Sequence, residues 1–177
     1  ADDFVVTPWN VEGDIDYDKL IKRFGTQKIT PDLLSKIEKF TNESHFMLRR
    51  GIFFSHRDLN RLLDDYEKGK KFFLYTGRGP SGHTHIGHLV PWVFAKWLQD
   101  KFGAKMYFQL TDDEKFWAKK DMTLEKTSQF ALENALDFIA LGFKPENTKI
   151  IIDTKNIKTL YPIAAEVAKR INFSNTK

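Results

Sequence analysis

Residues 71–88 read KFFLYTGRGPSGHTHIGH, and this stretch says more about the fold than any other part of the 177-residue chain. The apolar run from Phe72 to Thr76 is typical of a parallel strand that is covered on both faces. A glycine-rich turn follows, and then a helix that begins near His85. Glycine lets a backbone approach a ligand closely, and the unpaired N–H groups at a helix N-terminus favour anions. The stretch therefore predicts a nucleotide site that suits a phosphate chain.

Three motifs overlap in this stretch. Residues 77–82, GRGPSG, match the G-x-G-x-x-G dinucleotide pattern, but Asp112 and Asp113 follow about 30 residues later, where about 20 are expected. Residues 77–84 also match a phosphate loop, except that His83 replaces the lysine that supplies its fixed charge. The third motif is residues 85–88, HIGH, two imidazoles at the start of a helix with a glycine between them. We favour this third interpretation.

The chain before residue 71 predicts mainly helices. Residues 1–14 suggest a short hairpin or an extended arm. Residues 16–24 have the apolar spacing of one helical face and end at a glycine, and a second helix runs from a Thr30 cap to about Phe40. Ser55 is expected to begin a third helix, with Asp58 completing an approximate capping box. Its expected buried stripe consists of Leu59, Leu62, Leu63 and Tyr66.

From residue 71 the pattern alternates between strand and helix. The expected strands are residues 72–76, 105–111 and 149–153, and the expected helices are residues 85–102, 123–143 and 157–171. Parallel strands joined by right-handed crossovers make an α/β fold with a βαβαβα order. Ligands bind such sheets beyond the carboxyl ends of the strands, where both polar motifs lie. We place a domain boundary after Lys70, between residues 1–70, a hairpin or arm with a helical appendage, and residues 71–177, the nucleotide fold.

Composition excludes few functions. The net charge of +4 and the pI near 9.1 allow RNA binding without requiring it. The absence of cysteine excludes disulfides and thiolate metal sites. His83, His85 and His88 do not have a familiar zinc spacing, so no protein metal site is expected. No apolar run approaches the roughly 20 residues that span a bilayer, so the sequence reads as that of an unanchored, cytoplasmic protein.

Five segments resemble, in the same order, the class I aminoacyl-tRNA synthetases, and more narrowly the tryptophanyl-tRNA synthetases of the archaeal and eukaryotic type. They are residues 4–9 (FVVTPW), 16–21 (DYDKLI), 53–58 (FFSHRD), 77–88 and 109–115 (QLTDDEK). The resemblance implies the first half of a Rossmann-like catalytic domain with a helical N-terminal appendage. In that family a second half-domain, a lysine-bearing loop and an anticodon-binding domain follow. None of these is present in the 177 residues, which alone are therefore expected to be inactive.

The resemblance also implies a function. Such an enzyme, a cytoplasmic homodimer, activates tryptophan with ATP and Mg²⁺ to tryptophanyl-adenylate and transfers it to tRNA(Trp). His85, His88 and Arg78 would stabilise charge on phosphate, with Gly77, Gly79 and Gly87 completing the ATP site. Tyr75 and Gln109 would read the indole N–H, and Glu114 would bind the α-amino group.

Alternatives stay open at this point. Tyr75 and Gln109 also fit ordinary strand residues, and Asp112, Asp113 and Glu114 also fit a solvated acidic turn. In an extended stretch, adjacent carboxylates would point to opposite sides. The same motifs are compatible with a tyrosine-specific ligase or another nucleotidyltransferase, or with a non-catalytic module that binds ATP or RNA.

Overall fold

The computed structural model describes residues 4–6, 11–13, 16–172 and 174 of the chain. The chain divides into two compact units, residues 1–71 and residues 72–177. The break lies one residue beyond the boundary expected from the sequence. Each unit is described by itself below.

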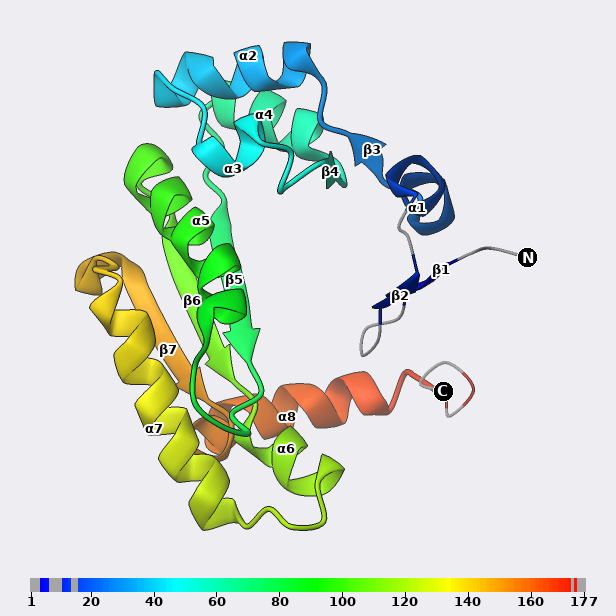
Figure 1. Cartoon of the computed structure of the whole chain (residues 1–177). Coiled ribbons are helices and arrows are strands. Elements are labelled where there is room, and N and C mark those ends of the chain that lie inside the picture. The colour runs from blue at the N-terminus through cyan, green and yellow to red at the C-terminus, as the bar shows by residue number, and fades with distance from the viewer. Residues whose placement is uncertain (1–3, 7–10, 14–15, 173, 175–177) are drawn as a thin grey trace. The chain divides into compact units, whose positions relative to one another are not determined.

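The described part of the N-terminal unit contains a hairpin and four helices (Figure 1). Strand β1 (Phe4–Val6) pairs antiparallel with β2 (Val11–Gly13), so the arm is a hairpin in its described part. The rest of the arm, including residues 7–10, lies outside the described residues. The other elements are α1 (Tyr17–Phe24), β3 (Gln27–Lys28), α2 (Pro31–Thr41), α3 (Phe46–Arg49), β4 (Ser55–His56) and α4 (Leu59–Glu67).

The first two helices begin and end where local chemistry predicts. The Asp16 carboxylate accepts the N–H groups of Asp18 and Lys19, and Gly25 ends α1 with a φ of +59°. The Thr30 hydroxyl accepts the N–H of Leu33 at 3.3 Å. The predicted end at Gly25 and the predicted Thr30 cap are therefore confirmed, and Asp16 is a further cap that the sequence analysis did not name.

The helix expected to begin at Ser55 begins instead at Leu59. Ser55 and His56 form β4, which pairs antiparallel with β3. Asp58 makes no side-chain cap, and His56 Nδ1 accepts the N–H of Leu59 at 3.2 Å. Of the expected stripe, only Leu63 is fully buried. The capping-box prediction was wrong because pairing with β3, distant in sequence, holds this segment extended.

The second unit is an α/β fold around a parallel sheet, as predicted. The sheet order is β5-β6-β7, formed by β5 (Phe73–Arg78), β6 (Lys105–Leu110) and β7 (Thr148–Ile152). Its helices are α5 (Ile86–Phe102), α6 (Asp112–Ala118), α7 (Leu124–Ala140) and α8 (Ile157–Ala168), with short 3-10 turns η1 (Pro145–Asn147) and η2 (Thr154–Asn156).

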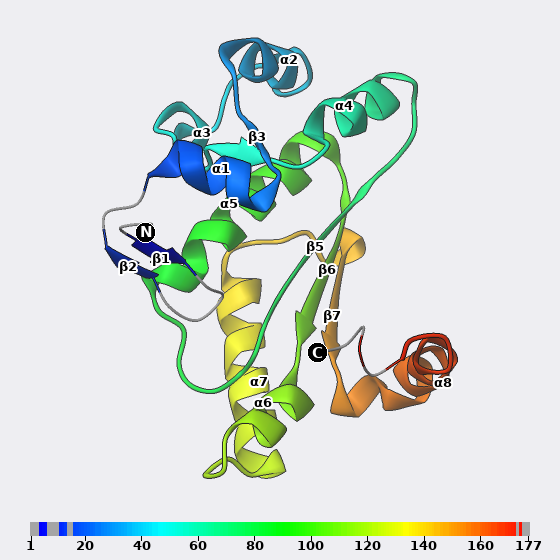
Figure 2. The ribbon, with the colours of Figure 1, turned by 90° about the vertical axis from the view of Figure 1, so that its right-hand side faces the viewer.

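Helices α5 and α7 lie against the same face of the sheet (Figures 1 and 2). Trp92 of α5 packs edge-on against Phe108 of β6, with ring centroids 5.1 Å apart. Phe108 stacks on Phe138 of α7 at 3.8 Å, and Phe138 stacks on Phe143 at 4.0 Å. Each such pair contributes about 0.5–1.5 kcal/mol beyond its buried area. This aromatic column fixes the two helices on the sheet.

The expectation that the first strand is covered on both faces was wrong. Side chains of β5 alternate in burial, and Phe73 and Tyr75 are 64% and 62% exposed. The strands follow one another in sequence order, and right-handed crossovers between them put α5 and α7 on one face. Tyr75 is therefore presented on the opposite face, and an apolar strand composition does not reveal this asymmetry.

Candidate active site

The candidate site lies where the three parallel strands end. In the sheet register Gly77 pairs with Gln109, and Gln109 pairs with Ile151. The glycine-rich loop follows β5, α6 follows β6, and Asp153 follows β7. Three segments that are far apart in sequence therefore end at one edge of the sheet.

A chain of hydrogen bonds crosses the three strands. The Tyr75 hydroxyl donates to Gln109 Oε1. Gln109 Nε2 donates to Asp153 Oδ1 at 2.8 Å and to Oδ2 at 3.0 Å. Asp153 is 7% exposed, and burial raises the pKa of its carboxyl, as do the nearby Asp113 and Asp112, while the Gln109 amide opposes this rise. The structure thus brings Tyr75 and Gln109 together.

Asp153 was missed by the sequence analysis. It comes directly after the third strand of the sheet, at the same edge as the two motifs that were singled out. An acidic residue at the carboxyl end of a parallel strand is the signal that could have identified it.

The acidic segment after β6 is the first turn of α6, so the extended alternative was wrong; the solvated alternative was wrong for Asp112, which is buried, whereas Glu114 is exposed. Asp112 is fully buried and accepts the Thr154 N–H at 3.1 Å and the Thr154 hydroxyl at 2.5 Å. Three carboxylates in a first helical turn are favoured by the helix dipole. The helical turn therefore stabilises these carboxylates, which an extended segment would not do.

Glu114 is held by its neighbours. It accepts from Lys115 Nζ at 2.8 Å and from the Thr111 hydroxyl at 2.9 Å. These bonds, the one from Lys115 first, lower the pKa of the Glu114 carboxyl. Among the described residues no hydrogen bond or ion pair joins Glu114 to Tyr75 or Gln109, so its predicted binding of an α-amino group stays a prediction.

Arg78 points into the glycine-rich loop. Its guanidinium donates to the Thr84 hydroxyl at 2.7 Å and to the carbonyls of Gly82 and His83 at 2.9 and 2.7 Å. Burial lowers the pKa of Arg78, and Asp137 opposes this shift. In this arrangement Arg78 shapes the loop, and contact with a phosphate stays a prediction.

Asn134 of α7 holds the same loop from the other side. It is fully buried, and its Nδ2 donates to the Gly82 carbonyl at 3.2 Å. Its Oδ1 is buried without a hydrogen-bond partner among the described residues. The sequence analysis missed Asn134, because a polar residue inside a helix pattern gives no sign of which loop it meets.

We expect Asn134→Ala to destabilise the protein by about 1–3 kcal/mol, since the Gly82 carbonyl loses a buried donor. Gln129→Ala on the exposed part of the same helix is the control, and it should change the unfolding free energy by less than about 0.5 kcal/mol. Urea unfolding measures both values. Equal losses for the two variants would contradict a specific role for Asn134.

The two imidazoles of the HIGH motif cap α5. His85 Nδ1 accepts the Gly87 N–H at 3.2 Å, and His88 Nδ1 accepts the His85 N–H at 3.3 Å. Their ring centroids are 3.8 Å apart. A neutral imidazole that accepts at Nδ1 carries its proton on Nε2. Both rings are therefore neutral Nε2–H donors at a helix N-terminus, where an anion is favoured.

The glycines of the site differ in what a side chain there would meet. A Cβ at Gly77 would lie 2.4 Å from the Gln109 carbonyl oxygen of the neighbouring strand, so this position requires glycine. A Cβ at Gly79 would lie 1.9 Å from Cε of Lys115, the flexible end of a long side chain that can move aside. At Gly87 a Cβ would lie 3.1 Å from the His85 ring, so this glycine leaves room for the helix cap. Its predicted second purpose, room for a nucleotide, is untested.

Stability should depend on His88 below neutral pH. Burial first, and then the neighbouring Arg78 and His85, lower the pKa of His88 below its usual 6.5. The unfolded chain therefore takes up a proton before the folded chain does, and stability falls as pH drops through 6.5. We expect NMR to show a His88 pKa below 6.5, and the unfolding free energy of His88→Gln to fall less between pH 7.5 and 5.5. A His88 pKa of 6.5 or higher would contradict this.

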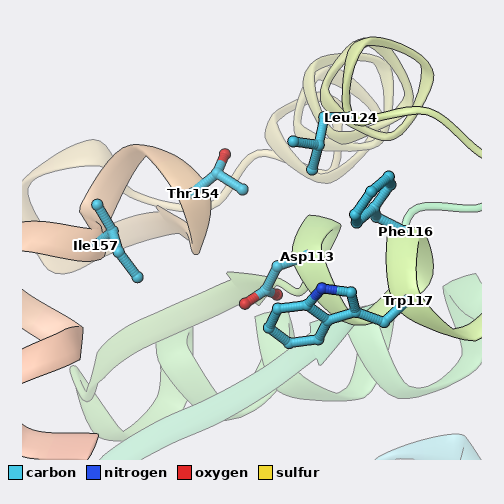
Figure 3. A pocket seen from close by; sticks show the side chains of 6 residues that line it. All are labelled: Asp113, Phe116, Trp117, Leu124, Thr154 and Ile157. Carbon is cyan, nitrogen blue, oxygen red and sulfur yellow. The ribbon is translucent and has the colours of Figure 1, made fainter. Parts of the chain in front are cut away.

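An apolar pocket of about 270 Å³ lies beside α6 (Figure 3). It contains none of the residues predicted for the site. In the figure Asp113 and Trp117 lie next to each other on its floor, facing Thr154 and Ile157 from the chain after β7. Its lining residues are Asp113, Phe116, Trp117, Leu124, Thr154 and Ile157.

In the described part of the chain, no group of three or more His, Asp or Glu side chains is arranged to hold a metal ion. No described helix combines the length and apolar character needed to cross a bilayer.

Comparison with known proteins identifies the family. Residues 67–171 match the model of the class I tRNA synthetases (W and Y). The tryptophan–tRNA ligases of Sulfurisphaera tokodaii and Pyrococcus abyssi are 56% and 52% identical to the whole chain, which covers 47% and 46% of their lengths. The chain thus spans about half the length of these curated relatives.

Solved structures agree with this assignment. The tryptophanyl-tRNA synthetase from Trypanosoma brucei is 48% identical with a TM-score of 0.84, over 90% of this chain and 48% of that one. The enzyme from Plasmodium falciparum is 45% identical with a TM-score of 0.86, over 91% and 45%. The resemblance stated from the sequence is confirmed, and the chain belongs to the class I tRNA synthetases of the W and Y family.

Proposed function

We propose that this chain forms the ATP- and tryptophan-binding part of a tryptophan–tRNA ligase. The hydrogen-bonded pair of Tyr75 and Gln109 carries the proposal, because it places two polar oxygens on the sheet face that α5 and α7 leave open. A buried polar group that a wrong side chain leaves unpaired gives strong discrimination. The family and the names of its close relatives support tryptophan as the ligand.

The activation step needs no covalent nucleophile from the protein. A carboxylate oxygen of tryptophan attacks the α-phosphorus of ATP, and the bond to pyrophosphate breaks. The protein must then stabilise the negative charge that develops on the phosphate oxygens in the transition state. The Nε2–H donors of His85 and His88 suit this task, and they are already oriented by their cap bonds. The magnesium ion would arrive with ATP, so it needs few protein ligands.

The proposal extends to partners and location. We propose that the tryptophanyl group is then transferred to the terminal adenosine of tRNA(Trp); the name of the relatives, tryptophan–tRNA ligase, supports tRNA as the acceptor. We also propose a homodimer, which the family resemblance implies, and which light scattering on purified protein tests. Protein synthesis places this reaction in the cytoplasm.

Exchange of labelled pyrophosphate into ATP tests the proposal. The protein, expressed from its complete coding sequence, should show exchange that depends on tryptophan and not on tyrosine. Exchange with tyrosine instead would favour the other specificity of this family. ATP binding by calorimetry without any exchange would favour a non-catalytic binding module.

A further inference from the structure

We infer that Asp153 is a positioning residue that locks the Gln109 amide in one orientation, so that its oxygen is presented to a hydrogen-bond donor where we propose that the indole ring binds. This inference rests on the proposed function and deepens it, since it concerns how the same site selects an aromatic N–H. Asp153 itself would not touch the ligand. It would act through Gln109.

The hydrogen bonds around Gln109 decide its orientation. Nε2 faces both carboxylate oxygens of Asp153, at 2.8 and 3.0 Å, and Oε1 faces the Tyr75 hydroxyl. A carboxylate can only accept hydrogen bonds. Rotating the amide by half a turn would set its oxygen against those two oxygens, in a place where Asp153 is nearly inaccessible to water. An unpaired buried polar group is costly, so the observed orientation is strongly favoured.

Asp153 is itself held firmly by backbone hydrogen bonds. Its N–H donates to the Leu110 carbonyl at 3.1 Å, and its carbonyl accepts the Asn156 N–H at 3.1 Å. The next residue, Thr154, is bonded to the buried Asp112 through both its N–H and its hydroxyl. The carboxylate therefore sits on a backbone that is anchored on both sides, as an orienting group requires.

The locked amide determines what the pair can offer a ligand. Tyr75 gives its only hydroxyl proton to Gln109 Oε1, so its oxygen presents lone pairs. Gln109 Oε1 keeps a second lone pair, while one N–H of its amide points at the two Asp153 oxygens. The side of the pair formed by Gln109 Oε1 and the Tyr75 oxygen thus presents acceptors. An indole N–H is a donor and fits there, whereas a ring atom that has no proton to donate would set its own lone pairs against them.

The test compares tryptophan with its benzothiophene analogue, in which sulfur replaces the indole N–H. Pyrophosphate exchange gives kcat/KM for both amino acids with the protein from its complete coding sequence. The unmodified enzyme should prefer tryptophan by at least about 100-fold. In Asp153→Asn the new amide can pair with either orientation of Gln109, so the preference should fall below about 10-fold.

Gln99→Ala is the control, because this fully buried amide of the same unit bonds the Thr148 hydroxyl and the Lys144 N–H and is bonded to neither Gln109 nor Asp153. It should lower stability and keep the preference of the unmodified enzyme. An unchanged preference in Asp153→Asn, or an equal loss in both variants, would overturn the inference. If the unmodified enzyme does not activate tryptophan at all, the proposed function itself fails, and this inference fails with it.

A second measurement covers the case in which Asp153→Asn does not fold. In ¹⁵N-labelled unmodified protein, the Gln109 side-chain amide should exchange its hydrogens at least about 10-fold more slowly than the exposed Gln27. The Gln109 signal is identified by its loss in Gln109→Ala. Equal exchange rates would show that the amide is not locked and would overturn the inference.

Discussion

His85→Ala and His88→Ala are each expected to slow adenylate formation by roughly 100- to 1,000-fold, with little change in tryptophan affinity. Each substitution removes one Nε2–H donor at the helix N-terminus where phosphate charge would develop. Loss of one such donor costs about 2.7–4 kcal/mol at the transition state. Pyrophosphate exchange measures the rate, and calorimetric titration with tryptophan measures the affinity.

The same imidazoles also cap α5, so loss of the cap has to be separated from loss of the Nε2–H donor. His85 Nδ1 caps α5, so alanine also removes a cap worth about 1 kcal/mol of stability. His85→Asn restores a good capping side chain but provides no donor at the position of Nε2. It should therefore recover stability and stay slow. Rates within a factor of two of the unmodified enzyme for either alanine variant would contradict the assignment.

Gln109→Ala is expected to weaken tryptophan binding by about 1–3 kcal/mol, or roughly 5- to 150-fold, while ATP binding changes little. The indole N–H loses its acceptor, and the Tyr75 hydroxyl loses the partner that orients it. Asp153 loses its amide donor as well, so the protein should also become less stable. Separate KM values for tryptophan and ATP in pyrophosphate exchange give the comparison.

Gln99→Ala is a matched control for this effect. Gln99 is an equally large, fully buried amide in the same unit, bonded to the Thr148 hydroxyl and the Lys144 N–H. Its loss should lower stability without favouring one substrate over the other. If Gln109→Ala raises the KM values for tryptophan and ATP equally, as a general destabilisation would, then Gln109 does not read the indole.

The sequence by itself determined the elements that local chemistry controls. Caps at Asp16 and Thr30 are made by side chains within three residues of the groups they satisfy, so they can be read from the chain. Three apolar runs separated by helices are sufficient for a parallel sheet, because right-handed crossovers leave few topologies. Motifs at the ends of two of these strands also indicated the candidate site and identified the family.

Only the tertiary structure decided the features that depend on partners far away in sequence. Ser55 and His56 are strand because β3 pairs with them, and Arg78 turns into the loop because its acceptors are there. The open face that presents Tyr75 follows from both crossover helices packing on one side. Asp153 enters the site because the sheet sets the end of β7 beside Gln109, 44 residues earlier in the chain. Such contacts are set by packing and strand register, and neither is encoded in the local pattern around the residues that they join.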